Sequence, residues 1–186
     1  MERDLIAAGF GGQGVMMFGT LLAQGTTDAT DKQVTYFPSY GAEMRGGTAN
    51  CYVAISDDEI GAPVMDQVDD LVIFNEASLE KFIGKLKQGG TLFLNTSIVK
   101  SRLEREDIHV VEAPVTEMAL EMGNAKVLNI IMLGVYVGYT QVIEKDVILH
   151  AIKHKICAKR PQLVPLNNEA FEKGLAIGAA AREQGK

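Results

Sequence analysis

Near its start the chain reads Leu5-Ile6-Ala7-Ala8-Gly9-Phe10-Gly11-Gly12-Gln13-Gly14-Val15, in which an apolar run is followed by a cluster of glycines. Residues 5–8 form a short apolar run, as expected of a buried strand, and Gly9 ends it. From Val15 to Gln24 the apolar side chains recur with the spacing of one helical face. The glycines in between allow a sharp change of chain direction. The stretch therefore predicts a strand, a tight turn and a helix.

Strand and helix patterns alternate through the rest of the chain. Further strands are expected at residues 33–37, 50–56, 70–75, 91–95 and 108–111, the first of them stopped by Pro38. Further helices are expected at 79–87, 115–122, 127–139, 144–156 and 169–182, the first of them capped by Ser78 and closed by Gly89-Gly90. This order predicts a single domain over residues 1–186. We expect a three-layer α/β fold with a mostly parallel mixed sheet and a helical C-terminal part.

The glycines Gly9, Gly11 and Gly14 have the G-x-G-x-x-G spacing of a phosphate-binding turn. The amides and the partial positive charge of a helix N-terminus attract an anion at such a turn. A dinucleotide site also needs an acidic residue about 20 residues further on, at the end of the second strand. Here that strand is followed by Pro38 and Ser39. Three interpretations stay open: close packing of strand and helix alone, binding of another anion, and a weakened nucleotide site.

The composition argues against several functional classes. With 186 residues, 47% of them hydrophobic, the chain can bury one core without disulfides or metals. A net charge of −6 opposes a grip on nucleic-acid phosphates, so nucleic acid is not an expected partner. The longest apolar stretch, residues 127–137, is interrupted by Asn129 and falls short of the roughly 20 residues of a membrane span. No secretory signal is apparent, and we expect a cytoplasmic protein.

Cysteines and histidines give no metal pattern. Cys51 and Cys157 are too few and too widely spaced to hold an iron–sulfur cluster or a zinc ion alone, and reduced thiols are expected. His150 and His154 share a helical face, but the H-E-x-x-H glutamate is missing. A solvated helix face is the simpler interpretation. No metal-binding residues and no catalytic residues are predicted in this chain.

A segment without helix or strand periodicity follows the second expected strand and is predicted to be a loop: Ser39-Tyr40-Gly41-Ala42-Glu43-Met44-Arg45-Gly46-Gly47-Thr48. Arg45 is a candidate to bind a carboxylate or phosphate, with an ion pair to Glu43 as the alternative. Loop-stabilising hydrogen bonds are the alternative role for the polar side chains. The candidates for ligand or subunit contact are Tyr40, Glu43, Arg45, Gly46 and Gly47.

Three stretches resemble the gamma subunits of the pyruvate, 2-oxoglutarate and 2-oxoisovalerate ferredoxin oxidoreductases. Residues 9–15 are close to the G-x-G-G-Q-G-V opening of that family, and residues 39–51 are similar to its loop of tyrosine, acid and R-G-G. Residues 59–63 with the strand at 70–75 resemble its I-x-x-P segment and the strand that follows. The resemblance covers most of residues 4–140. It implies a gamma-type α/β domain in a multisubunit enzyme.

The resemblance also implies where the chemistry takes place. In such enzymes thiamine diphosphate with Mg and iron–sulfur clusters carry out oxidative decarboxylation of a 2-oxoacid, coenzyme A takes the acyl group, and ferredoxin or another acceptor takes the electrons. Asn167-Asn168 is not preceded by the Gly-Asp-Gly of a thiamine site. The redox centres are therefore expected on partner alpha and beta subunits, with a ferredoxin-like delta subunit in some assemblies. The chain alone is expected to be inactive, and a homodimer can form when it is isolated.

Coenzyme A is the anion that the resemblance implies for the glycine turn. The candidates for contact with coenzyme A or another anion are Gly11, Gly12, Gln13 and Gly14. Gln13 would present its amide to a phosphate, cap the helix or contact a subunit. Branched-chain 2-oxoacids and 2-oxoglutarate are the expected substrates, ahead of pyruvate. The competing interpretations are an independent nucleotide-dependent oxidoreductase and an assembly module without a ligand.

Overall fold

A computed structural model describes residues 2–40, 48–101 and 103–185, and of Tyr40 it describes the backbone. The strands are β1 (Glu2–Phe10), β2 (Gln33–Tyr40), β3 (Thr48–Ser56), β4 (Val68–Ile73), β5 (Leu86–Asn95) and β6 (His109–Ala113). They form one six-stranded sheet in the order β2-β3-β1-β4-β5-β6. The pairings from β1 through β4 and β5 to β6 are parallel, whereas β3 is antiparallel to both β1 and β2. The sheet is therefore mixed and mostly parallel, as predicted.

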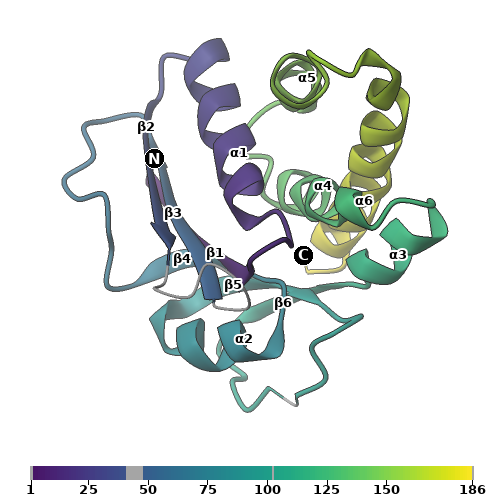
Figure 1. Cartoon of the computed structure of the whole chain (residues 1–186). Helices are drawn as coiled ribbons and strands as arrows, with labels where there is room; N and C mark the ends of the chain where they lie inside the picture. The colour runs from purple at the N-terminus through teal and green to yellow at the C-terminus, as the bar shows by residue number, and fades with distance from the viewer. Residues whose placement is uncertain (1, 41–47, 102, 186) are drawn as a thin grey trace.

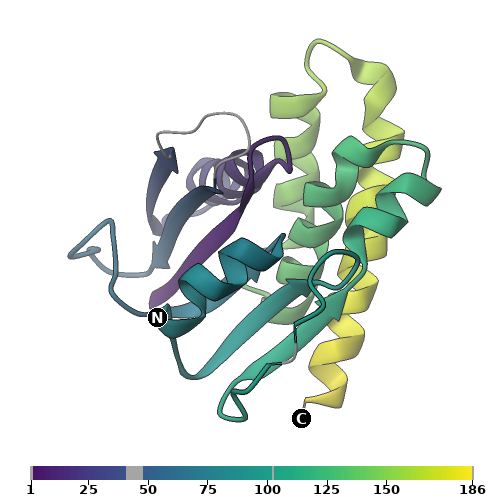
Figure 2. The same ribbon diagram turned by 60° about the horizontal axis from the view of Figure 1, so that its bottom comes forward.

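Helices cover both faces of the sheet and give the predicted three layers (Figures 1 and 2). The helices are α1 (Val15–Ala29), α2 (Glu76–Phe82), α3 (Val115–Glu121), α4 (Leu128–Thr140), α5 (Lys145–Ala151) and α6 (Val164–Gln184). The helix α2 lies on one face, and α1, α3, α4, α5 and α6 lie on the other. A π-helix, Ile152–Ile156, continues α5. The C-terminal part is helical, as the sequence indicates.

The two faces of the sheet bury separate apolar cores. Alternate residues of a strand point to opposite faces, so Leu5 and Ala7 enter the larger core, beside α1 and α4. Ile6 and Ala8 enter the smaller core, which α2 covers. The central strand β1 is thus buried on both sides.

The helices α4 and α6 pack backbone against backbone. Their contact is lined by glycines at four-residue spacing on both helices, Gly134 and Gly138 facing Gly174 and Gly178. A methyl group added at Gly174 would lie 1.9 Å from the carbonyl oxygen of Ile131, and one added at Gly134 would lie 2.2 Å from that of Phe171. Neither position has room for a side chain. The glycines therefore set the distance between the two helices.

The strand β2 does not end at Pro38, as predicted from the sequence, but continues to Tyr40. This strand is at the edge of the sheet, paired on one side with β3. Proline has no N–H to donate, so it is tolerated in an edge strand where its nitrogen faces away from the partner. The prediction was wrong because the edge position is not visible in the sequence.

The predicted helix at 79–87 is also wrong at both ends. The helix α2 begins at Glu76, because the side chain of Asn75, not Ser78, caps it: Asn75 Oδ1 accepts a hydrogen bond from the Ser78 amide at 2.9 Å. A 3-10 turn follows, and Leu86 already belongs to β5, where Gly89-Gly90 accompanies a shift of register. Similarly, α6 begins at Val164 rather than at residue 169.

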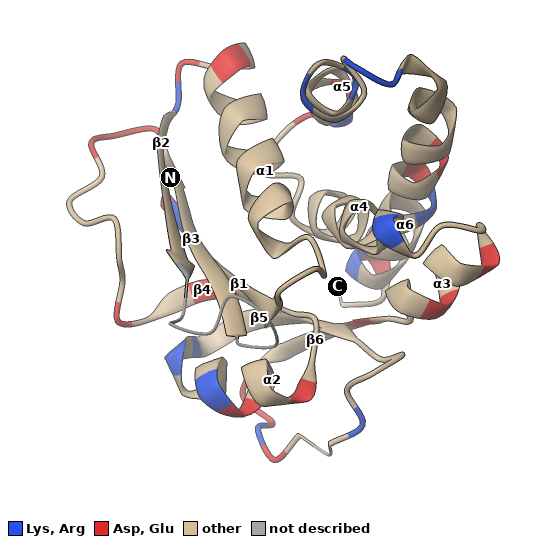
Figure 3. Cartoon of the chain, in the orientation of Figure 1, with Lys and Arg blue, Asp and Glu red and all other residues tan. Residues whose placement is uncertain are grey.

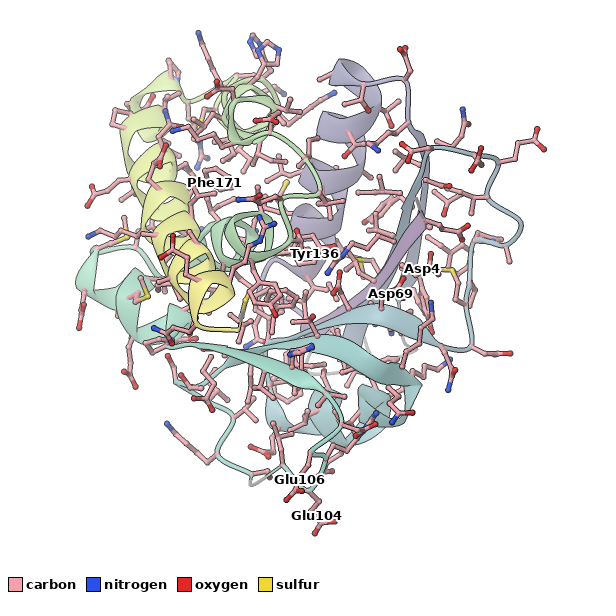
Figure 4. The ribbon with its side chains drawn as sticks, turned by 180° about the vertical axis from the view of Figure 1, so that it is seen from behind. Asp4, Asp69, Glu104, Glu106, Tyr136 and Phe171 are labelled. Atoms are coloured by element: carbon pink, nitrogen blue, oxygen red, sulfur yellow. The ribbon has the colours of Figure 1, made fainter. Side chains whose placement is uncertain are left out.

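A buried ionic network ties the start of β1 to β4 and α4. The carboxylate of Asp70 is fully buried and accepts two hydrogen bonds from the Arg3 guanidinium and one from the Tyr136 hydroxyl at 3.0 Å. Burial, with Asp70 beside it, raises the pKa of Tyr136 well above its ordinary value, so the hydroxyl stays a donor. Figure 4 shows Asp4 and Asp69 close together at the same end of the sheet, where the Asp4 amide donates to Asp69.

Candidate functional site

The glycine turn joins the carboxyl end of β1 to the first residue of α1. Gly12 and Gly14 have φ angles of +98° and +77°, a region that side chains strain to enter. Gly14 is the N-cap residue of α1, and no side chain of the described residues caps the helix. A methyl group at Gly14 would lie 2.6 Å from the Asn129 side chain. Both the conformation and the packing therefore require glycine at this position.

The side chain of Gln13 stabilises the turn by hydrogen bonds to the residues around it. Its Oε1 accepts hydrogen bonds from the Phe10 amide at 2.7 Å and from Asn75 Nδ2 at 3.1 Å, and its Nε2 donates to the Phe74 carbonyl at 3.2 Å. The side chain thereby bridges the carboxyl ends of β1 and β4. In this structure Gln13 holds the turn in place rather than pointing its amide outward.

Two further side-chain amides, those of Asn129 and Asn95, stabilise the turn and the end of β4 next to it. Asn129 Nδ2, on α4, donates to the Gly14 carbonyl at 3.2 Å. Asn95 Nδ2, at the end of β5, donates to the Phe74 carbonyl at 3.1 Å and to Thr116 Oγ1 at 2.9 Å. Sequence reasoning did not identify the role of these asparagines, although each one either ends or interrupts an apolar run. That placement was the available signal, since a polar residue there needs a partner.

The turn lies where the chain connections diverge. From β1 the chain passes through α1 towards β2 on one side, and from β4 it passes through α2 to β5 on the other. In open α/β sheets ligands bind at the carboxyl ends of the strands beside such a point. Gly11 and Gly12 are exposed there, and a side chain at Gly12 would meet none of the described residues within 4 Å. The outer surface of the turn and the N-terminus of α1 are thus open to an anion.

The loop with the remaining candidate residues starts and ends beside the turn. Thr48 begins β3 and pairs with Phe10, while Tyr40 pairs with Ala49, the neighbour of Gly9 across the ladder. The other candidates lie outside the described residues: Glu43, Arg45, Gly46 and Gly47. The backbone of Tyr40 is therefore brought to the same end of the sheet as Gly11–Gly14.

The topology disfavours a dinucleotide site. In a dinucleotide-binding fold the ribose acid comes from the strand next to β1. Here β3 lies between β1 and β2, so a residue at the end of β2 is two strands away from the turn. Asp28 lies at the far end of α1 and pairs with Lys155 at 3.7 Å.

The cysteines and histidines lie away from the turn or are buried beneath it. Cys51 is buried under α1, and burial raises the pKa of its thiol to about 12. His150 and His154 line a groove of about 460 Å³ between α1 and α5, with ring centroids 4.1 Å apart. Within the described part of the chain, no three His, Cys, Asp or Glu side chains are placed to hold a metal ion. Among the described residues, no helix combines the length with the apolar composition that a membrane span needs.

Known proteins share both the fold and the sequence. Ketoisovalerate oxidoreductase subunit VorA of Methanothermobacter marburgensis is 34% identical over 169 residues, which are 90% of this chain and 34% of VorA. The chain thus spans about a third of that relative. The keto/oxoacid ferredoxin oxidoreductase gamma subunit of Geobacter sulfurreducens PCA has a TM-score of 0.84 at 28% identity, covering 97% of this chain and 98% of the other.

A second solved structure is similar over nearly the whole chain. It is the 2-oxoglutarate:ferredoxin oxidoreductase of Magnetococcus marinus with 2-oxoglutarate, coenzyme A and succinyl-CoA bound, with a TM-score of 0.89 at 25% identity. The match covers 96% of this chain and 31% of that one. A family profile described as pyruvate ferredoxin/flavodoxin oxidoreductase matches residues 4–177. The chain therefore belongs to the pyruvate ferredoxin/flavodoxin oxidoreductase family.

Proposed function

We propose that this chain is the gamma subunit of a multisubunit 2-oxoacid:ferredoxin oxidoreductase. The observation that carries the proposal is the match over almost the full length of a separate gamma subunit from Geobacter sulfurreducens. The complex would catalyse coenzyme A-dependent oxidative decarboxylation of a 2-oxoacid in the cytoplasm. The chain would act as one domain of it, over residues 1–186, and would be inactive alone.

The thiamine diphosphate, Mg and iron–sulfur centres of this complex belong to partner chains in the proposal. Alpha and beta subunits would carry them, with a ferredoxin-like delta subunit in some assemblies and ferredoxin or another acceptor taking the electrons. Two observations support this division. Cys51 and Cys157 are free thiols buried in the larger core, and VorA is much longer than the part that this chain matches. Branched-chain 2-oxoacids and 2-oxoglutarate are the proposed substrates, ahead of pyruvate, in keeping with the names of the similar proteins.

Coenzyme A contact is proposed at the outer surface of the glycine turn. Its phosphates would accept hydrogen bonds from the uncapped amides at the start of α1, next to the exposed Gly11 and Gly12. Gln13 would position the turn, and Gly14 would allow the close approach of Asn129. Tyr40, Glu43, Arg45, Gly46 and Gly47 are proposed to contact the ligand or a partner subunit from the adjoining loop.

Purification of the tagged native protein tests the assignment as a subunit. We expect larger subunits to co-purify and the eluate to show the visible absorption of iron–sulfur clusters. The isolated chain should have no oxidoreductase activity. Recovery of the chain alone with a bound nucleotide would instead favour an independent nucleotide-dependent enzyme. Larger partners without any coenzyme A affinity in the complex would favour an assembly module.

Gly12→Asp is expected to weaken binding of coenzyme A to the assembled complex at least tenfold, about 1.4 kcal/mol. The new carboxylate would repel the phosphates, and Gly12 is exposed, with no described residue within 4 Å of an added Cβ. Isothermal titration of coenzyme A into the complex measures the change.

The matched control is Gly123→Asp. Gly123 also has a positive φ, +78°, and open space at its Cβ, but it lies at the end of α3, outside the turn. The variant carries the same added charge and likewise places a side chain at a positive φ. Equal affinity of the wild-type and Gly12→Asp complexes for coenzyme A would contradict the proposal that coenzyme A binds at the turn.

A further inference from the structure

In the part of the chain that the structure describes, no helix covers β2 on the α2 side of the sheet. The smaller core on that side takes side chains from β1, β3, β4 and β5 but, among the described residues, none from β2. Phe37 of β2 pairs with Tyr52 of β3, which pairs with Ile6 of β1, and paired residues point to the same face. Phe37 therefore points to the α2 side, where 44% of it is exposed.

A second aromatic side chain continues this face towards the glycine turn. Phe10 lies two residues after Ala8 of the smaller core, so it points to the same side, and 39% of it is exposed. Lysines from α2 and the turn after it border the face (Figure 3): Lys85 Nζ lies 5.8 Å from the Tyr52 ring centroid, and Lys81 Nζ lies 3.5 Å from Thr48 Oγ1. We call this set the wing patch: Phe10, Phe37, Thr48, Tyr52, Lys81 and Lys85.

The edge of β2 is less suited to binding than its face. Pro38 has no N–H, so it can only occupy a position whose nitrogen points away from β3. A strand added to this edge would lack a donor in the middle of the ladder. A partner that buries Phe37 would therefore pack onto the face of the sheet rather than extend it.

We propose that the wing patch is the docking surface for the partner subunit that corresponds to the rest of VorA. This inference rests on the proposed function. In VorA, a domain like this chain is joined to about twice its own length of further sequence. In the proposed function this chain is a separate subunit, so it would hold the equivalent partner by surface contacts. Exposed aromatic side chains with charged groups at the rim are typical of such contacts.

The wing patch indicates where the partner subunit lies and which side chains its surface carries. Phe10 is the last residue of β1, directly before the exposed Gly11, so a subunit seated on the patch borders the glycine turn. The lysine rim calls for acidic side chains around an apolar centre on that subunit. A ligand at the turn would then lie at the junction of the two chains.

Phe37→Glu tests the proposal in the co-expressed complex. We expect the full-length tagged variant to bind the partner subunit at least tenfold more weakly, measured by retention after purification and by biolayer interferometry. The control is Val110→Glu, a residue 39% exposed on β6, the opposite edge strand. This control should bind within twofold of wild type. Thermal melts of both variants check that the fold is intact.

A charge reversal keeps the proposal testable if Phe37→Glu does not fold. Lys85→Glu should weaken binding at least threefold at low salt and less at high salt, whereas Lys126→Glu, on an exposed site before α4, should not. Unchanged binding by either patch variant, or equal losses in patch and control variants, would overturn the proposal. So would a dimer of the isolated chain that Phe37→Glu dissociates while partner binding is unchanged. Failure of the wild-type chain to retain any partner would count against the proposed function itself.

Discussion

Replacing Gly174 with alanine is expected to lower the free energy of unfolding by about 3 kcal/mol or more, or to prevent folding. The added methyl group would lie 1.9 Å from the carbonyl oxygen of Ile131. That oxygen belongs to the backbone of α4 and cannot move by a change of rotamer. The helices α4 and α6 would have to separate along their contact, with loss of packing around Tyr136 and Phe171. Urea denaturation followed by circular dichroism measures the loss.

Gly84→Ala is the matched control for this substitution. Gly84 lies in the turn after α2, where an added methyl group meets nothing within 4 Å. The same change of residue type should therefore alter stability by less than about 0.5 kcal/mol. Equal stability of Gly174→Ala and Gly84→Ala would show that the α4 and α6 contact is looser than described.

Arg3→Ala is expected to cost about 3–5 kcal/mol of stability, because it leaves the buried carboxylate of Asp70 without its cation. The side chain of Asp70 is 0% accessible to water, so water cannot take the place of the lost guanidinium. The Tyr136 hydroxyl would still donate a hydrogen bond to the carboxylate. The Arg3 side chain is itself 24% accessible, so the value should fall towards the lower end of that range. Chemical denaturation at neutral pH provides the measurement.

Two comparisons distinguish the network from an ordinary surface ion pair. Lys32→Ala removes one partner of Asp57 in a pair whose side chains are 30% and 50% accessible, and it should cost far less stability than Arg3→Ala. Adding Asp70→Asn to Arg3→Ala should restore part of the lost stability, because the unpaired charge is removed. A loss for Arg3→Ala no larger than that for Lys32→Ala would contradict the buried network.

The sequence predicted those parts of the fold whose cause is local. A strand–turn–helix unit is predicted by neighbouring residues alone: the apolar run before Gly9, the glycines after it and the helical spacing from Val15. The structure has that unit. The α4 helix followed in the same way from its apolar pattern. The family resemblance rested on the glycine turn at residues 9–15 and on two further segments, residues 39–51 and 59–75, and the family profile confirms it.

Other features depend on contacts between distant residues and were not predictable. Nothing near β3 indicates that it lies between β1 and β2, and nothing near Pro38 indicates an edge strand. The helix α2 was misplaced because Asn75, rather than Ser78, caps it, and Leu86 is drawn into β5 by its pairing with Val68. At the site, the glycines were identified from their spacing. Besides the nearby Phe10 amide, the partners of Gln13 are Phe74 and Asn75, 61 and 62 residues further along the chain.

The hydrogen bonds that hold the glycine turn in place affect how fast it can bind an anion. Gln13 and Asn129 hold the turn by hydrogen bonds to the protein itself, before any anion arrives. The turn therefore loses little conformational entropy when it binds an anion, and its amides need no rearrangement. Encounter, rather than closure of the turn, would then limit the association rate. Among anions that compete for this turn, differences in affinity should appear mainly as differences in residence time.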